Sequence, residues 1–264
     1  MKIGFIGCGK MGSSILYGVE GKIFNTKDIF VCEKDEKIRL NFIREGINVV
    51  ASLTPLCKEV DVILLAVKPQ DFAFVLENLR GQVDGKLIIT IAAGITTSFI
   101  EDYLGSVKVA RAMPNTAALI GEASSVVCFN SFLTEEDKSL VLKIFETIGK
   151  VIEIDENQMD DIIPIGGSFT AYQYYFYKGF LESSVKRGID EKVAKKVLIQ
   201  SIIGSAKMIE SQNKSIDELI SDVCSKGGTT LAGLKEFEDN NLLKIIDDCA
   251  SSCANRSKEL GKKD

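Results

Sequence analysis

Apolar and polar positions follow two different patterns along the chain. Up to about residue 156, short apolar runs recur at 2–6, 29–32, 47–50, 62–67, 86–93, 107–113, 124–129 and 150–154. Amphipathic stretches with helical spacing separate most of the early runs, for example at 35–46 and 69–81. Strands and helices that alternate in this way predict βαβ units, and therefore an α/β fold with a doubly wound parallel sheet covered by helices on both faces.

The pattern changes beyond residue 156, where strand-like runs stop and helical spacing takes over. Apolar residues recur at helical intervals in 159–188, 190–212 and 215–223, and two more helices are predicted before the C-terminus. We therefore expect a first domain at 1–157 and an all-helical domain at 158–264. With this much apolar surface, the helical part is expected to be a substrate domain or a dimerisation module.

Composition narrows the classes of partner. The net charge of −5 argues against nucleic acid as a partner, because phosphate binding relies on clustered Lys and Arg. No apolar run is long enough to cross a bilayer, and the N-terminus lacks the layout of a signal peptide, so a cytoplasmic protein without a membrane partner is expected. The seven cysteines are scattered and form no C-x-x-C pair, and Asp160 and Asp161 are expected on an exposed helix face, so no metal site is predicted.

A glycine-rich loop follows the first predicted strand and opens a helix. The loop fits G-x-G-x-x-G, and all six of its residues are expected to bind a cofactor: Gly7, Cys8, Gly9, Lys10, Met11 and Gly12. In this context Gly7 permits the tight turn, Gly9 lets the backbone approach a pyrophosphate, and Gly12 allows close helix–strand packing. The helix N-terminus then presents free N–H groups to the phosphates. The first domain is therefore predicted to be a dinucleotide-binding, Rossmann-type domain.

The end of the second predicted strand is expected to contact the adenosine ribose. Glu33 lies there, and a carboxylate suits the two ribose hydroxyls of NAD and repels the 2′-phosphate of NADP. Lys34 is adjacent and Arg39 is near, and either cation could serve NADP. The choice between NADH and NADPH stays open at this point.

Five segments together resemble one enzyme family. They are AVKPQ at 66–70, RAMPNTAALIGE at 111–122, IQSIIGSAKM at 199–208, KGGTTLAGLKEFE at 226–238 and RSKEL at 256–260. In this order and at these distances they resemble pyrroline-5-carboxylate reductase, the oxidoreductase that completes proline biosynthesis. The resemblance covers essentially the whole chain. It implies reduction of the cyclic imine 1-pyrroline-5-carboxylate to L-proline by NADPH or NADH, in a dimer or in a decamer built from dimers.

The resemblance also assigns site residues. Positions expected against the cofactor are Ser52, Ala66, Val67, Lys68, Pro69, Ala93, Gly94 and Asn115, together with Glu33, Lys34 and the glycine loop. Ser225, Gly228, Thr229 and Thr230 are expected to bind the substrate, with Thr230 as the catalytic hydroxyl beside the ring nitrogen.

The residues themselves are compatible with this chemistry. The chain has no histidine, which excludes Ser-His-Asp and Cys-His catalysis. An imine that binds already protonated is electrophilic without an enzyme acid, so orientation and exclusion of water can suffice. Backbone N–H groups at a helix start can hold a carboxylate without arginine, and Gly227 and Gly228 would expose such groups. The alternative is that Ser225 or Thr229 only caps a helix.

Four positions depart from the family pattern: Lys10, Phe169, Thr170 and Lys226. They leave two alternatives open, a reductase of another cyclic imine and an inactive dinucleotide-binding paralogue with a regulatory role of the competence type. A 3-hydroxyacid dehydrogenase shares the N-terminal fold, but Lys178 comes late in the segment where its catalytic lysine is expected, so we disfavour it.

Overall fold

The computed structural model describes residues 1–261, which form two compact units. One unit contains residues 1–170 and the chain from Ser251 onward, and the other contains Ala171–Ala250. The units thus divide after Thr170 and again after Ala250, within helices α8 (Phe169–Lys186) and α12 (Leu242–Leu260). The predicted domain boundary at 157/158 stays a prediction.

The first unit is built on one eight-stranded sheet of order β3-β2-β1-β4-β5-β6-β7-β8. Its strands are β1 (Ile3–Ile6), β2 (Ile29–Cys32), β3 (Asn48–Val49), β4 (Val62–Leu65), β5 (Leu87–Thr90), β6 (Lys108–Met113), β7 (Ala123–Phe129) and β8 (Gly149–Glu153). The strands from β3 to β6 are parallel, whereas β7 is antiparallel to β6 and β8 is parallel to β7. The reversal occurs because only the short 3₁₀ helix η3 (Thr116–Ile120) joins β6 to β7, and parallel neighbours need a longer crossover.

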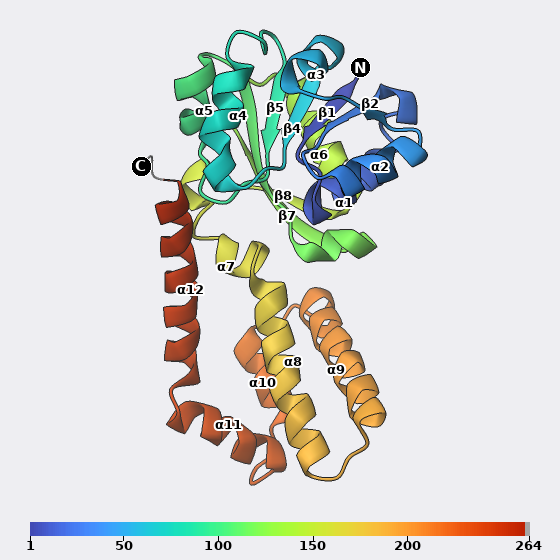
Figure 1. The fold of residues 1–264 in the computed structure, drawn as a ribbon. Helices are drawn as coiled ribbons and strands as arrows, with labels where there is room; N and C mark the ends of the chain where they lie inside the picture. Colours follow the sequence, from blue (N-terminus) through green and yellow to red (C-terminus); the bar gives the residue numbers. More distant parts are fainter. Residues whose placement is uncertain (262–264) are drawn as a thin grey trace. The chain divides into compact units, whose positions relative to one another are not determined.

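Helices cover both faces of this sheet (Figure 1), as the apolar pattern predicted. Alternate strand residues point to opposite faces, so Phe5 belongs to one core and Ile6 to the other. The Phe5 core includes residues of α1 (Lys10–Val19), α2 (Glu36–Arg44) and α6 (Glu135–Glu146). The Ile6 core includes residues of α3 (Leu53–Glu59), α4 (Phe72–Leu79) and α5 (Thr97–Leu104). The predicted α/β fold with a doubly wound sheet is confirmed.

The segment 159–188 is helical but interrupted. A short helix α7 (Ile163–Gly166) ends at the first residue of the Gly166–Gly167 pair, and α8 starts at Phe169. The second unit then contains most of α8, α9 (Glu191–Ser211), α10 (Ile216–Val223), α11 (Thr229–Asp239) and the first part of α12.

The second unit buries few of its own side chains. Within its described helices only Ala194 is buried, while Tyr175, Val197 and Leu243 are 77%, 60% and 83% exposed. Apolar surface of this extent is typical of an interface with another protein chain.

Candidate functional site

The glycine loop has the geometry expected for a phosphate-binding turn. Gly7 has φ +77°, and a Cβ there would lie 2.9 Å from Val67 Cγ1 and 3.0 Å from the Ala66 carbonyl oxygen. A Cβ on Gly12 would lie 3.0 Å from the Gly7 carbonyl oxygen and 3.2 Å from the Cβ of Ala66. The structure therefore brings four predicted cofactor residues together, and a side chain at Gly7 or Gly12 would crowd Ala66.

Gly9 differs from the other two glycines because its open side faces free space. It is the N-cap of α1, with no side-chain cap, and a Cβ built on it has no neighbour within 4 Å. The first turn of α1 contains no acidic residue. Backbone N–H groups at this helix start are thus left for a ligand, and their partial positive charge favours phosphate. A dinucleotide pyrophosphate fits this arrangement.

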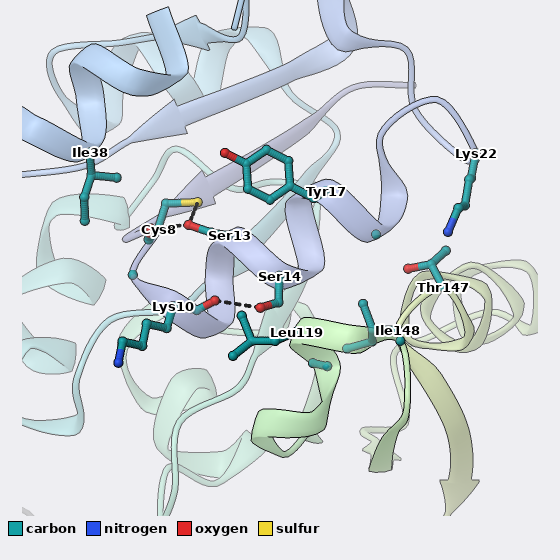
Figure 2. Close-up of a pocket in the computed structure, with 14 residues that line it drawn as sticks. Cys8, Lys10, Ser13, Ser14, Tyr17, Lys22, Ile38, Leu119, Thr147 and Ile148 are labelled. Carbon is teal, nitrogen blue, oxygen red and sulfur yellow. Dashed lines mark hydrogen bonds between the residues drawn. The ribbon is translucent and has the colours of Figure 1, made fainter.

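A surface pocket of about 520 Å³ runs along α1 from the glycine loop. Figure 2 shows its lining, with Lys10 near one end of the helix and Lys22 near the other. Ser13 Oγ donates a 2.7 Å hydrogen bond to the Cys8 carbonyl, and Ser14 Oγ donates one of 2.8 Å to the Lys10 carbonyl. These hydroxyls therefore support the loop and the first turn. Lys10 is exposed, which leaves its ammonium free to approach a phosphate.

Cys8 lies inside the loop and is fully buried. Burial is the main cause that raises the pKa of its thiol to about 12. The negative charge of Glu33 also raises this pKa, whereas a hydrogen bond from Ser13 lowers it. The thiol is therefore neutral at physiological pH, and it places no negative charge beside the phosphate-binding amides.

Glu33 follows β2 directly and contacts the loop. Its carboxylate accepts hydrogen bonds from the backbone N–H of Cys8 at 2.5 Å and of Asp35 at 2.9 Å. Lys34 is exposed and pairs with Asp71 at 3.0 Å. Ser52 is the exposed N-cap residue of α3, and its side chain makes no capping hydrogen bond.

The residues after β4 and β5 have different surroundings. Lys68 is exposed and Pro69 begins the 3₁₀ helix η2 (Pro69–Asp71). Ala93 packs on a small core around Met113 and Met159. Gly94 has φ +77°, and a Cβ there would lie 2.4 Å from the Ser257 carbonyl oxygen, so the glycine allows the last turn of α12 to approach.

Asn115 holds the turn after β6 in place. Its side-chain oxygen accepts a hydrogen bond from the Ala117 N–H at 3.1 Å, and its amide donates to the Gly166 carbonyl at 3.1 Å. The next residue, Thr116, lies 3.3 Å from Thr170 between hydroxyl oxygens. Thr170 is one of the departures from the family pattern, and it thus adds a contact to the MPNT turn.

Sequence reasoning missed a buried charge network beneath this turn. Arg111 is fully buried in β6, and its Nη2 donates to Asp160 Oδ1 at 2.8 Å while Nη1 lies 3.8 Å from Glu156. Asp160 also accepts a 2.7 Å hydrogen bond from Ser257 Oγ in α12. The expectation that Asp160 is exposed is therefore wrong, whereas Asp161 is exposed and pairs with Lys258. An arginine within an apolar strand was the available signal, because a buried charge needs a partner.

The glycine–threonine segment lies in the second unit. It forms a turn after α10, in which Gly227 has φ +72° and the Gly228 N–H donates to the Ser225 carbonyl at 2.9 Å. Gly228, not Ser225 or Thr229, is the N-cap of α11, and no side chain caps this helix. Thr229 is exposed and Thr230 is half-buried in the first helical turn. The simple capping alternative is therefore not what the structure shows.

Residues 1–261 contain neither a candidate metal-binding cluster nor a candidate membrane span. No group of three or more Cys, Asp or Glu side chains in that range is arranged to hold a metal ion. Within the same range, no helix has the length and hydropathy to cross a membrane.

Comparisons with known proteins give the family. The model "Pyrroline-5-carboxylate reductase dimerisation" matches residues 156–260, and the model "NADP oxidoreductase coenzyme F420-dependent" matches residues 2–94. The pyrroline-5-carboxylate reductase of Arabidopsis thaliana is 32% identical, over 99% of this chain and 96% of its own length. That of Methanosarcina acetivorans is 34% identical, over 99% and 98%.

A solved structure agrees with these relatives. The pyrroline carboxylate reductase of Plasmodium falciparum, crystallised with NADP bound, superposes with a TM-score of 0.92. It is 31% identical to this chain and covers 99% of it, with 98% of its own length matched. Sequence, fold and helical dimerisation region thus agree, and the chain belongs to the pyrroline-5-carboxylate reductase family.

Proposed function

We propose that this protein reduces 1-pyrroline-5-carboxylate to L-proline with NADPH or NADH. The observation that carries the proposal is the full-length similarity to pyrroline-5-carboxylate reductases, which includes both the glycine loop and the helical region. The reaction adds hydride to the carbon of the protonated imine, which gives a neutral amine. That nitrogen then takes up a proton from water to give the ammonium form of proline. A reductase of another cyclic imine and a regulatory paralogue are not favoured by these relatives.

The cofactor would be held by the first unit and would supply the hydride. Gly7, Gly9 and Gly12 shape the loop, and the uncapped start of α1 would bind the pyrophosphate. Cys8, Lys10 and Met11 complete the loop. Ser52, Ala66 to Pro69, Ala93, Gly94 and Asn115 remain the proposed contacts to the rest of the cofactor. Their backbone and side-chain positions at the ends of β3, β4, β5 and β6 suit this role, because ligands of doubly wound sheets bind at the carboxyl ends of the strands.

The substrate carboxylate would bind at the start of α11. Ser225 and Thr229 offer hydroxyls and backbone N–H groups at a helix N-terminus without acidic residues in its first turn. Gly228 would let the carboxylate approach this turn, although its own N–H is bonded to the Ser225 carbonyl. The partial positive charge of this end stabilises an anion by up to about 2 kcal/mol where it is partly buried. Thr230 would accept a hydrogen bond from the N–H of the protonated imine and donate one to the nitrogen of the amine as it forms. Because the chain has no histidine, we propose that the imine binds already protonated.

The matched dimerisation region supports self-association of the chain. We further propose a dimer as the smallest assembly and a decamer built from dimers as the larger state, to be distinguished by light scattering against the chain mass of 28.9 kDa. A boundary between the two domains at 157/158 and a cytoplasmic location complete the proposal.

The decisive experiment combines turnover with product identification. Purified full-length protein, 1-pyrroline-5-carboxylate and either reduced nucleotide should consume the nucleotide and form proline. Thr230→Val should lower kcat about 10- to 100-fold, because one hydrogen bond to a charged group contributes about 1.5–3 kcal/mol. Thr230→Ser keeps the hydroxyl and should retain most activity. If Thr230→Val turns over as fast as the wild type, the hydroxyl has no catalytic role. Nucleotide binding without any turnover by the wild type would favour the regulatory paralogue.

A further inference from the structure

Glu33 is positioned beside the site where a dinucleotide would present its adenosine ribose. Its predecessor Cys32 pairs in register with Ile6, and the Gly7 N–H donates to the Cys32 carbonyl at 2.9 Å. The Glu33 side chain therefore leaves β2 directly against the glycine loop. In this fold, the residue at the end of β2 contacts the ribose hydroxyls.

Two backbone groups fix the Glu33 carboxylate. The N–H of Cys8 binds Oε2 and the N–H of Asp35 binds Oε1. An ionised carboxylate has about four acceptor positions, so about two remain, one on each oxygen. Two neighbouring hydroxyls that donate hydrogen bonds, as in the ribose of NADH, satisfy these positions. A 2′-phosphate carries about −1.5 to −2 charges and acts as an acceptor, so it meets the same carboxylate with repulsion.

The charges around Glu33 reinforce this selection. Asp35 adds a carboxylate two residues away, and Lys34 is paired with Asp71. The cations near the strand end that could oppose the selection include Lys34, Lys37 and Arg39. The pair between Lys34 and Asp71 is exposed and therefore weak. Although burial raises the pKa of the Cys32 thiol more strongly, Arg39 lies close enough to lower that pKa.

We infer that Glu33 makes this protein prefer NADH to NADPH, because its fixed carboxylate accepts the ribose hydroxyls and repels a 2′-phosphate. The inference rests on the proposed reductase function for its physiological meaning, but cofactor binding tests it independently. The Plasmodium falciparum relative was crystallised with NADP, so binding of NADPH by this chain has to be measured directly.

The test measures dissociation constants for NADH and NADPH by calorimetry with the full-length protein, and competition by AMP and by adenosine 2′,5′-bisphosphate. Like charges brought together at a binding site cost several kcal/mol, so NADH should bind at least about tenfold more tightly. Glu33→Gln keeps the shape of the side chain and one acceptor oxygen. It should reduce the ratio of the NADPH to the NADH dissociation constant at least about tenfold, chiefly because NADPH and the bisphosphate bind more tightly.

The matched control is Glu36→Gln. It removes the same charge three residues away, at the exposed first residue of α2, and should leave the ratio within about twofold. Wild-type protein that binds NADPH as tightly as NADH would overturn the inference. So would an unchanged ratio in Glu33→Gln, or loss of NADPH binding in Lys34→Ala, which would assign the 2′-phosphate to that lysine.

Turnover separates this inference from the proposed function. Efficient proline formation with NADPH as the better cofactor refutes the role of Glu33 and leaves the reductase intact. Selective NADH binding without proline formation by either cofactor supports the role of Glu33 and refutes the reductase.

Discussion

Removal of the carboxylate of Asp160 should destabilise the first unit far more than removal of its neighbour Asp161. The Arg111 side chain is 1% exposed, and Asp160 accepts its 2.8 Å hydrogen bond. The Nε atom of Arg111 already has no hydrogen-bond partner within the described residues. Asp160→Ala would leave a buried guanidinium with only Glu156, at 3.8 Å, as a counter-charge.

The magnitude follows from the burial of this pair. Breaking a buried ion pair by removing one partner costs about 3–5 kcal/mol. Because Asp160 is 18% exposed and Glu156 remains, we expect a loss near the lower end, about 3 kcal/mol. At roughly 2–4 °C per kcal/mol for a chain of this size, the melting temperature should fall by about 6–12 °C.

Asp161→Ala is the internal control. Its pair with Lys258 joins the same two segments as the hydrogen bond from Ser257 to Asp160, but the Asp161 and Lys258 side chains are 63% and 49% exposed. Exposed pairs contribute about 0–1 kcal/mol, so the melting temperature should change by less than about 4 °C. Both variants are compared by thermal melting at one protein concentration, because self-association also stabilises the fold.

A double variant tests whether the unpaired charge is the cause. Arg111→Met with Asp160→Ala removes both charges, and it should melt above Asp160→Ala alone, since an apolar side chain needs no counter-charge. If Asp160→Ala melts within about 2 °C of the wild type, or if the double variant is the less stable of the two, the reasoning about the buried charge is wrong.

Two further predictions concern the first unit. Gly9→Ala should keep the wild-type melting temperature within a few degrees, because its Cβ has no neighbour, but weaken dinucleotide binding about tenfold in calorimetry; Gly7→Ala, at φ +77°, should instead lose about 1–2 kcal/mol of stability. Partial burial raises the pKa of Asp137, but hydrogen bonds from Lys108 and Thr134 outweigh it and lower the pKa overall. Its stabilising contribution is therefore present above the unfolded pKa of about 3.9 and is lost as pH falls further, so the melting difference between wild type and Asp137→Asn should shrink below about pH 4.

Local signals in the sequence predicted much of the fold. The short apolar runs and the helical spacing predicted the sheet and its covering helices, and the glycine spacing identified the turn between β1 and α1. These features depend on neighbours within a few residues. The reversal at β7 was not predicted, because an apolar strand carries no mark of its direction.

The unpredicted parts of the site depend on contacts between distant positions. Arg111 and Asp160 are 49 residues apart, and Ser257 is 97 residues from Asp160. The constraint on Gly94 comes from the last turn of α12, and the Asn115 side chain is engaged by Gly166. No local pattern reports such pairs, although a charged residue inside an apolar strand indicates that a partner must exist.

Helix α12 begins in one compact unit and finishes in the other. A single cut of the chain therefore cannot yield two complete halves. A fragment ending at residue 157 would lack both Asp160 and Ser257, so Arg111 would lose its hydrogen-bonded carboxylate and keep only Glu156, at 3.8 Å, as a counter-charge. Truncations or fusions at the C-terminus should accordingly be judged first by what they do to the stability of the first unit.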